Sequence, residues 1–258
     1  MTIQVMLQIE ASGNNYSLES GLADNIKNFD HHKEEHRHYP SPSNNAAIIP
    51  IEDGVIEISH IDADTYIGLL RFYGEKLPDI DLNLVEQIDL NGSSICEDLY
   101  DEALLYMVGL TSLARRLEFP RCSIQPQDVT TYIEDLMRFS QKEILILGKL
   151  SADEIEKAYK KCGIARFNEI ALYSVDENDS FDPSRPYKDG IDIAVVYRQH
   201  YQSISIYCNP KSKYTFAGQN FLNIAFAGHP KACGSPRGVQ YCIEDATNLY
   251  KELIKTLH

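Results

Sequence analysis

The sequence lacks the features that mark membrane-spanning, secreted and zinc-knuckle proteins. No apolar run approaches the roughly 18 residues that a membrane span requires, and the segment Met1 to Val5 lacks the basic and apolar regions of a signal peptide. The six cysteines include no C-x-x-C pair, so neither a disulfide framework nor a zinc knuckle is indicated. We therefore expect a cytoplasmic protein whose cysteines are buried or free thiols.

Positive charge is scarce and unevenly placed. The 258 residues contain 24 Lys and Arg against 38 Asp and Glu, a net charge of −14, which argues against binding to long duplex nucleic acid. Residues 1–160 carry 13 basic and 28 acidic side chains, whereas residues 161–258 carry 11 and 10. This division predicts an acidic domain suited to cations and a near-neutral domain suited to an anion, although solvated surface charge would explain the same excess.

Strand patterns early in the chain each lead into polar residues. Residues 3–10 alternate at period two and end near Glu10, residues 25–29 precede Asp30-His31-His32, and residues 55–58 precede His60-Ile61-Asp62-Ala63-Asp64. In open α/β sheets, ligands bind beyond the carboxyl ends of the strands, so we expect these loops to converge. The predicted fold class is α/β with a parallel sheet.

The rest of the chain predicts a helical segment and then a second, smaller α/β domain. Helices are expected at 83–88, 99–117, 127–147 and 151–161, with Gly148 ending the third. Strands are expected at 170–173, 191–197 and 203–207, and a last helix at 243–257. We predict a metal-binding catalytic domain at 1–160 and a substrate-binding domain at 161–258.

The spacing His60-x-Asp62-x-Asp64 places one imidazole and two carboxylates in a single short loop. Alternate residues of an extended segment point to opposite sides, so this loop can serve two cations. The mixed nitrogen and oxygen donors suit Mn²⁺, Fe²⁺ or Co²⁺ better than Ca²⁺, with Mg²⁺ as an alternative, and two Mn²⁺ ions are the predicted cofactors. A loop of solvated acids beside a helix N-terminus would have the same sequence.

Adjacent histidines beside an aspartate form the second motif, Asp30-His31-His32. Such side chains are costly to bury after an apolar strand unless they bind or hydrogen-bond something. The competing interpretation is a surface His-rich tract, since His36 and His38 lie nearby.

A Gly-rich segment, Ala227-Gly228-His229-Pro230-Lys231-Ala232-Cys233-Gly234-Ser235-Pro236-Arg237-Gly238, is the third motif. Its glycines would let backbone N–H groups approach an anion, and Arg237 could pair with phosphate, although an ordinary loop is the alternative. Together the three segments resemble the signatures of the DHH phosphoesterase superfamily, which includes RecJ-like exonucleases, nanoRNA phosphatases and exopolyphosphatases, with its associated C-terminal domain.

The resemblance implies two-metal, in-line attack of water on a short oligonucleotide, a dinucleotide or a phosphoanhydride. Metal ligands would be His60, Asp62, Asp64, Glu10, His31 and Asp89. His32 would contact phosphate or act as acid, and Asp30 would orient a ligand histidine. Substrate would be bound by Gly228, His229, Gly234, Ser235 and Arg237. The partner would be a small phosphorylated molecule or a short single-stranded oligonucleotide, not a membrane, and a homodimer is compatible with this assignment.

The chain departs from the family pattern in three places. Asp30-His31-His32 precedes the His60 motif, whereas the family has the opposite order, as a circular permutation would produce. Glu10 stands where the family has a bridging aspartate, and Ala227 and Cys233 replace a glycine and an alanine. Asp89 is the best candidate for the last family aspartate, with helix capping as its alternative and Asp24 as a competitor. The Glu10 substitution keeps a second function open, that of a metal- or nucleotide-binding sensor without catalysis.

Overall fold

The chain divides into two units, residues Met1–Ala152 and Asp153–His258. The computed structural model describes residues 3–19, 27–30, 40–96, 98–120, 122, 125–176, 179, 181–236 and 238–258. The division falls inside a long helix, α5 (Gln141–Cys162), eight residues before the expected boundary between residues 160 and 161. No helix among these residues has both the length and the apolar character needed to cross a membrane.

The first unit contains a five-stranded sheet with the order β3-β2-β4-β1-β5. Four strands run parallel: β1 (Ile3–Leu7), β2 (Tyr16–Leu18), β3 (Asn28–Phe29) and β4 (Gly54–Ile58). The edge strand β5 (Gln127–Asp128) runs antiparallel to β1. This mainly parallel sheet confirms the predicted fold class. Strand β4 matches the strand expected at 55–58 within one residue, and β1 lies within the expected range 3–10 but ends at Leu7.

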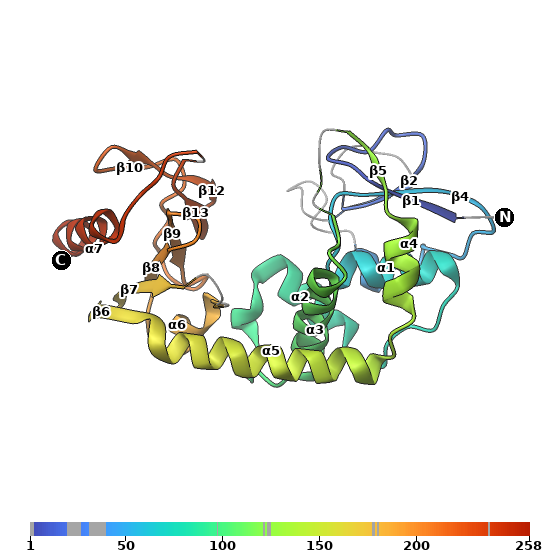
Figure 1. Ribbon diagram of the computed structural model, residues 1–258, viewed down its shortest axis with the longest axis horizontal. Coiled ribbons are helices and arrows are strands. Elements are labelled where there is room, and N and C mark those ends of the chain that lie inside the picture. Colours follow the sequence, from blue (N-terminus) through green and yellow to red (C-terminus); the bar gives the residue numbers. More distant parts are fainter. Residues whose placement is uncertain are drawn as a thin grey trace. The chain divides into compact units, whose positions relative to one another are not determined.

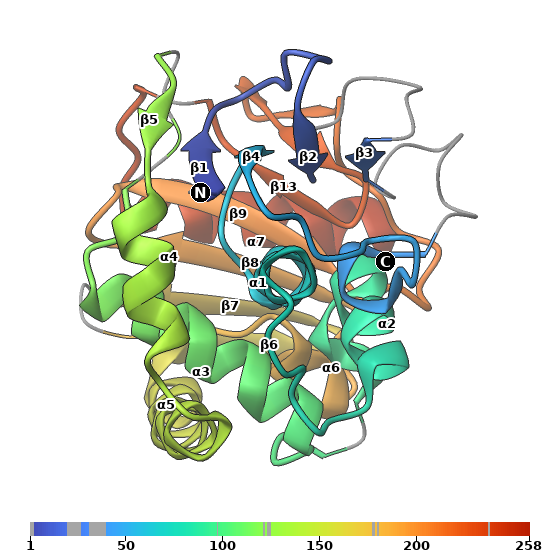
Figure 2. The same ribbon diagram turned by 90° about the vertical axis from the view of Figure 1, so that its right-hand side faces the viewer.

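The helices of this unit lie on one side of the sheet (Figure 1). They are α1 (Ala63–Tyr73), α2 (Leu82–Asn91), α3 (Glu102–Arg116), α4 (Thr130–Met137) and the first part of α5, with short 3₁₀ turns η2 (Pro42–Asn44) and η3 (Ser93–Ile95). Viewed from the side, α1 lies next to β4, the strand that precedes it (Figure 2). Its apolar residues Ile67, Leu69 and Phe72 are buried in the same core as Val5, Leu7 and Ile56.

Two glycines allow α3 and α5 to come into backbone contact. A Cβ atom at Gly109 would lie 2.0 Å from the carbonyl oxygen of Ile144, and one at Gly148 would lie 1.9 Å from that of Leu105. The Ser112 and Ser151 hydroxyls are 2.8 Å apart in the same interface. The prediction that Gly148 ends a helix and that another begins at Ser151 was therefore wrong, because both residues serve the helix crossing.

The predicted helix at 127–147 was also wrong at its start and in its continuity. Residues Gln127–Asp128 pair with β1 as a strand, and the helical region begins at Thr130. It then breaks at Ser140, whose backbone N–H and hydroxyl both donate to the Glu143 carboxylate, 2.8 and 2.6 Å away, at the start of α5.

The second unit contains a six-stranded sheet with the order β12-β13-β9-β8-β7-β6. Its strands are β6 (Gly163–Phe167), β7 (Ile170–Val175), β8 (Ile193–Arg198), β9 (Ser203–Cys208), β12 (Ala227–His229) and β13 (Ala232–Gly234), and only β7 and β8 pair in parallel. A separate hairpin joins β10 (Asn220–Phe221) to β11 (Ile224–Ala225).

Both faces of this sheet are covered by other parts of the second unit. This explains why β7 and β8 are apolar or aromatic at every position except Ser174 and Arg198. Ile170 and Leu172 pack into the core that contains Leu249 and Leu253 of α7 (Ile243–Leu257). The alternate residues Ala171 and Tyr173 face another core, near the short helix α6 (Ser184–Lys188). The bounds of α7 match the predicted last helix, and the smaller C-terminal α/β unit is confirmed.

A buried carboxylate on β4 organises the loop that follows β1. The Glu57 side chain is 2% exposed, and it accepts hydrogen bonds from the Ser12 N–H at 2.7 Å, the Ser12 hydroxyl at 2.6 Å and the Asn15 amide at 2.8 Å. These three donors satisfy a charge that would otherwise be costly to bury. The loop between β1 and β2 is thus tied to the strand beside it.

Replacing Glu57 with Gln is expected to lower the free energy of unfolding by about 1–3 kcal/mol. The Gln NH₂ group would replace one carboxylate oxygen, and it would then point toward a hydrogen-bond donor such as Ser12 that it cannot accept from. Urea unfolding measures this loss, and hydrogen exchange should show reduced protection of the Ser12 N–H. The exposed Glu52→Gln change is the matched control and should leave both unaltered. Equal behaviour of the two variants would contradict the role given to Glu57.

Candidate functional site

Three parallel strands end in one row and carry polar residues directly after it. The register pairs Leu18 of β2 with both Ile58 of β4 and Phe29 of β3. The next residues in each strand are therefore neighbours: Glu19, Ser59 and Asp30. The parallel sheet thus brings two of the predicted loops, those after β3 and β4, to the same edge.

Three carboxylates meet at this edge. One oxygen from each of Glu19, Asp64 and Asp89 lies within 4.8 Å of the others, and they form the group found among the described residues that could hold a metal ion. Glu19 is 6% exposed and Asp64 is fully buried, while Asp89 of α2 is half-buried. Hard oxygen donors at this spacing fit Mg²⁺ or Mn²⁺.

Asp64 lies in the first turn of α1 and is held by the turn η2. Its Oδ1 accepts the Ser43 N–H at 2.9 Å. Burial raises the pKa of Asp64 to about 6, the negative charges of Asp62 and Asp89 add to this, and hydrogen bonds from Ser43 oppose it. A carboxyl group that like charges and burial push toward its neutral form is one that a bound cation would return to the charged form.

His60 and Asp62 form a hydrogen-bonded pair beside this group. His60 Nε2 lies 2.9 Å from Asp62 Oδ2, and the Ser59 hydroxyl lies 2.7 Å from His60 Nδ1 while also donating to the Glu19 carbonyl. The bond to Asp62 raises the pKa of His60. Although burial raises the pKa of Asp62, bonds from His60 and Thr65 hold it below its usual value.

Asp62 has a second task as the N-cap of α1. Its Oδ1 accepts the Thr65 N–H at 2.9 Å, which leaves Oδ2 for His60. The motif therefore divides between two directions, with Asp62 paired to His60 and Asp64 turned toward Glu19 and Asp89. Asp62 and Asp64 diverge because Asp62 caps α1 while Asp64 lies in its first turn, and the binding of two cations by this motif stays a prediction.

Glu10 is not part of the acidic group that the structure brings together. Strand β1 ends at Leu7, and Glu10 lies exposed in the bend three residues later. The group contains Glu19 instead, directly after β2. Sequence reasoning missed Glu19 because Tyr16-Ser17-Leu18 is too short to show a strand periodicity, and the remaining signal was an acid directly after an apolar residue.

Several predicted site residues lie outside the described part of the chain. These are His31, His32 and Arg237, as well as the competitor Asp24. Asp30, which precedes the two histidines, is described and is 6% exposed. The roles assigned to these residues therefore stay predictions.

The Gly-rich segment forms the hairpin of β12 and β13 in the second unit. Gly228 has a φ of 132°, and a Cβ atom there would lie 2.9 Å from the Ala232 carbonyl oxygen, so the hairpin itself requires glycine. Ser235 forms two bonds with Ile204: its N–H donates to the carbonyl at 2.8 Å, and its hydroxyl accepts the N–H at 3.1 Å. His229 ends β12, and Gly234 ends β13. Anion binding by this segment stays a prediction.

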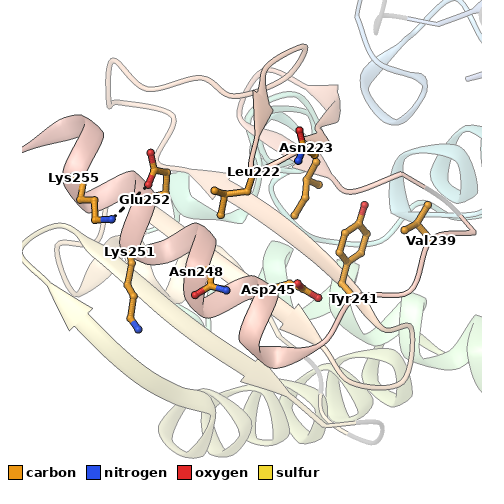
Figure 3. Close-up of a pocket in the computed structure, with 10 residues that line it drawn as sticks. Leu222, Asn223, Val239, Tyr241, Asp245, Asn248, Lys251, Glu252 and Lys255 are labelled. Atoms are coloured by element: carbon orange, nitrogen blue, oxygen red, sulfur yellow. Dashed lines mark ion pairs between the residues drawn. The ribbon is translucent and has the colours of Figure 1, made fainter.

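A pocket of about 640 Å³ lies in the second unit, between α7 and the turn of the β10–β11 hairpin (Figure 3). Tyr241 and Val239 line one end, and an ion pair between Lys255 and Glu252 lies at the other. None of the described residues predicted to bind substrate lines it. The pocket is therefore lined by residues to which the sequence assigned no role.

The fold and the site define a two-unit α/β protein with an acidic cluster at the carboxyl edge of a mainly parallel sheet. No protein-family model matches the sequence, and none of the curated proteins matches it. Among solved structures, the chain is similar to a pGpG-specific phosphodiesterase, PggH from Vibrio cholerae, with a TM-score of 0.46 and 16% identity over 95% of this chain and 85% of that one.

Two further solved structures are more distant. An exopolyphosphatase-related protein from Bacteroides fragilis has a TM-score of 0.33 and 12% identity, over 78% of this chain and 59% of that one. An uncharacterized protein from Helicobacter pylori G27 has a TM-score of 0.23 and 13% identity, over 68% and 52% of the two chains. These comparisons do not establish a family.

Proposed function

We propose that this protein is a divalent-metal-dependent phosphoesterase of the DHH type, acting on a short oligonucleotide, a dinucleotide or a phosphoanhydride. The observation that carries the proposal is the meeting of Glu19, Asp64 and Asp89 within 4.8 Å. This group lies at the strand ends where the motif His60-x-Asp62-x-Asp64 is expected to bind cations. The permuted motif order and membership of that superfamily are part of the proposal.

In this proposal Glu19, Asp64 and Asp89 hold one cation, and His60 with Asp62 holds a second. Glu19 takes the place that the sequence assigned to Glu10. Bound divalent cations would supply charge stabilisation for a phosphoryl group and a lower pKa for water. Mn²⁺ is the preferred ion because imidazole and carboxylate donors are combined.

Backbone N–H groups of the protein hold the Asp62 and Asp64 carboxylates in place. Thr65 orients Asp62 through its N–H, and Ser43 orients Asp64 in the same way. By resemblance, His31 adds a ligand, His32 contacts phosphate or donates a proton, and Asp30 orients a histidine. Gly228, His229, Gly234, Ser235 and Arg237 are the proposed contacts to the substrate anion.

Substrate size follows from charge. The chain's net charge of −14 disfavours long polyanions, because few Lys and Arg are available to replace their counterions. The negative charge of a small phosphorylated molecule is confined to a few atoms, so the bound cations and the Gly-rich segment would be enough to neutralise it.

Removing divalent metal is expected to abolish hydrolysis completely. The test incubates the full chain with a linear dinucleotide, a short single-stranded oligonucleotide, a 3′,5′-bisphosphate nucleotide and inorganic polyphosphate. Release of mononucleotide or phosphate should require Mn²⁺, stop with excess chelator and return when Mn²⁺ is restored. Turnover that persists in chelator would refute the metal-dependent mechanism. Binding across the panel without turnover would favour the sensor instead.

A further inference from the structure

The turn η2 holds Asp64 through Ser43, whose backbone N–H and backbone carbonyl are both hydrogen-bonded to side chains of α1. The Ser43 N–H donates to Asp64, and the Ser43 carbonyl accepts two bonds from Arg71, from Nε at 3.1 Å and Nη2 at 2.7 Å. Arg71 lies two helical turns after Asp64 on α1. Arg71 therefore holds Ser43 in place, and the Ser43 N–H in turn holds the Asp64 carboxylate.

The same turn is tied to α2, the helix that carries Asp89. The Ser41 N–H donates to Glu86 Oε1 at 3.0 Å, and the Asn44 amide donates to Glu86 Oε2 at 2.9 Å. Glu86 precedes Asp89 by three residues, so the two side chains lie on neighbouring positions of one helix face. The turn thus contacts both helices that supply carboxylates to the acidic group.

Packing leaves the turn little freedom to move. Ser41 and Ser43 are fully buried, and their hydroxyls are 2.9 Å apart. A Cβ atom at Gly68 of α1 would lie only 2.8 Å from the Cβ of Pro42, so the helix presents a bare backbone where the turn packs. A proline ring against a glycine is a rigid contact.

We infer that the turn η2, locked by Arg71 and Glu86, is a positioning element that sets the spacing of Asp64 and Asp89 for cation binding. The inference rests on the proposed metal site. Arg71 donates to a carbonyl and leaves the carboxylate oxygens available to a cation, while its two converging N–H groups restrain the carbonyl in a way that a lysine does not reproduce.

The experiment measures Mn²⁺ affinity by isothermal titration calorimetry on the full chain, together with the melting temperature in chelator. Arg71→Met should weaken Mn²⁺ binding about 10-fold or more, the size of effect typical of residues that orient metal ligands. Arg71→Lys should restore part of the affinity, because one donor to the Ser43 carbonyl returns. Glu86→Ala tests the other anchor and should also weaken binding.

Gln141→Met is the matched control. Gln141 also binds the backbone of another segment, accepting the Asp79 N–H at 2.8 Å and donating to the Asp79 carbonyl at 3.2 Å, and it contacts none of the three carboxylates. It should leave the Mn²⁺ affinity unchanged even where the melting temperature falls.

The outcomes separate the inference from the proposed function. Wild-type affinity in Arg71→Met, or in Glu86→Ala should the arginine variant fail to fold, overturns the inference, as does an equal loss in Gln141→Met. Absence of Mn²⁺ binding by the wild-type chain overturns the proposed metal site, and the inference with it.

Discussion

Replacing Asp64 with Asn is expected to abolish Mn²⁺-dependent hydrolysis and, at the same time, to stabilise the metal-free protein. The first effect follows because the amide removes one of three charges that converge within 4.8 Å. Orienting residues alone are worth 10–100-fold, so loss of a ligand should lower the rate by about 100-fold or more. Product release under saturating Mn²⁺ measures this loss.

The second effect follows from the pKa of Asp64, which burial raises to about 6 from its ordinary value of 3.8. A carboxyl group whose pKa is raised by folding favours the native state at low pH, and that contribution disappears as the pH rises from 3.8 through 6. At pH 7 the ionised group costs on the order of 2–3 kcal/mol, and a neutral Asn does not carry this cost. Calorimetry in chelator should show a higher melting temperature for Asp64→Asn at pH 7 and little difference near pH 3.5.

Asp53→Asn is the control for this pair of measurements. Asp53 is an exposed acid directly before β4, and it does not belong to the acidic group of Glu19, Asp64 and Asp89. It should change neither hydrolysis nor the melting temperature. An Asp64→Asn protein that retains full Mn²⁺-dependent activity would falsify the assignment of Asp64 as a ligand.

Replacing Gly148 with Ala is expected to destabilise the first unit strongly, although Ala is the better helix former. Helix propensity favours Ala by about 1 kcal/mol. Against this, the new methyl group would lie 1.9 Å from the Leu105 carbonyl oxygen, and backbone atoms cannot rotate away. Overpacking typically costs about 1–3 kcal/mol, and a contact this short with backbone belongs at the upper end of that range, so we expect a net loss of ~2 kcal/mol after the propensity gain. Urea unfolding monitored by circular dichroism measures it.

Lys149→Ala is the adjacent control, since Lys149 is exposed on the same helix. Its effect should stay within about 0.5 kcal/mol. Gly109→Ala should repeat the loss from the other side of the crossing, where the methyl group would meet the Ile144 carbonyl oxygen. A Gly148→Ala protein as stable as the wild type would show that α3 and α5 separate easily.

The fold could be predicted where the sequence pattern is local. The last helix and strands β4, β7, β8 and β9 follow from apolar runs that are long enough to show a period. Strand β2 and the hairpins formed by β10 to β13 have two or three residues per strand, which is too short for any period. Their existence depends on partners far away in the chain.

The crossing of α3 and α5 shows the opposite difficulty, because residue types that mark helix ends also occur inside helices that pack closely together. Gly148 and Ser151 have the sequence signature of a helix end and a new N-cap. In the folded chain the glycine permits close approach to Leu105, and the serine binds Ser112. Both partners lie in α3, and no property of residues 148–151 alone identifies them.

The candidate site was predictable in its location and only partly in its members. Strand ends with acids and histidines identified the edge of the sheet, and Asp64 and Asp89 are among the residues that meet there. Glu19 could not be distinguished from Glu10 because the choice depends on where β1 and β2 end. That boundary is set by pairing with β4, which sequence periodicity does not reveal.

The pairing of β2 with β4 also has a consequence for how the chain reaches its native state. Tyr16, Ser17 and Leu18 find their partners Ile56, Glu57 and Ile58 some forty residues later, in parallel. Such contacts form slowly, because the entropy cost of closing a long loop comes before the strand pairing that offsets it. We therefore expect Glu19, Asp64 and Asp89 to come together late in folding, once these strands have paired. A cation that binds all three would act on the completed fold and not as a template for its early steps.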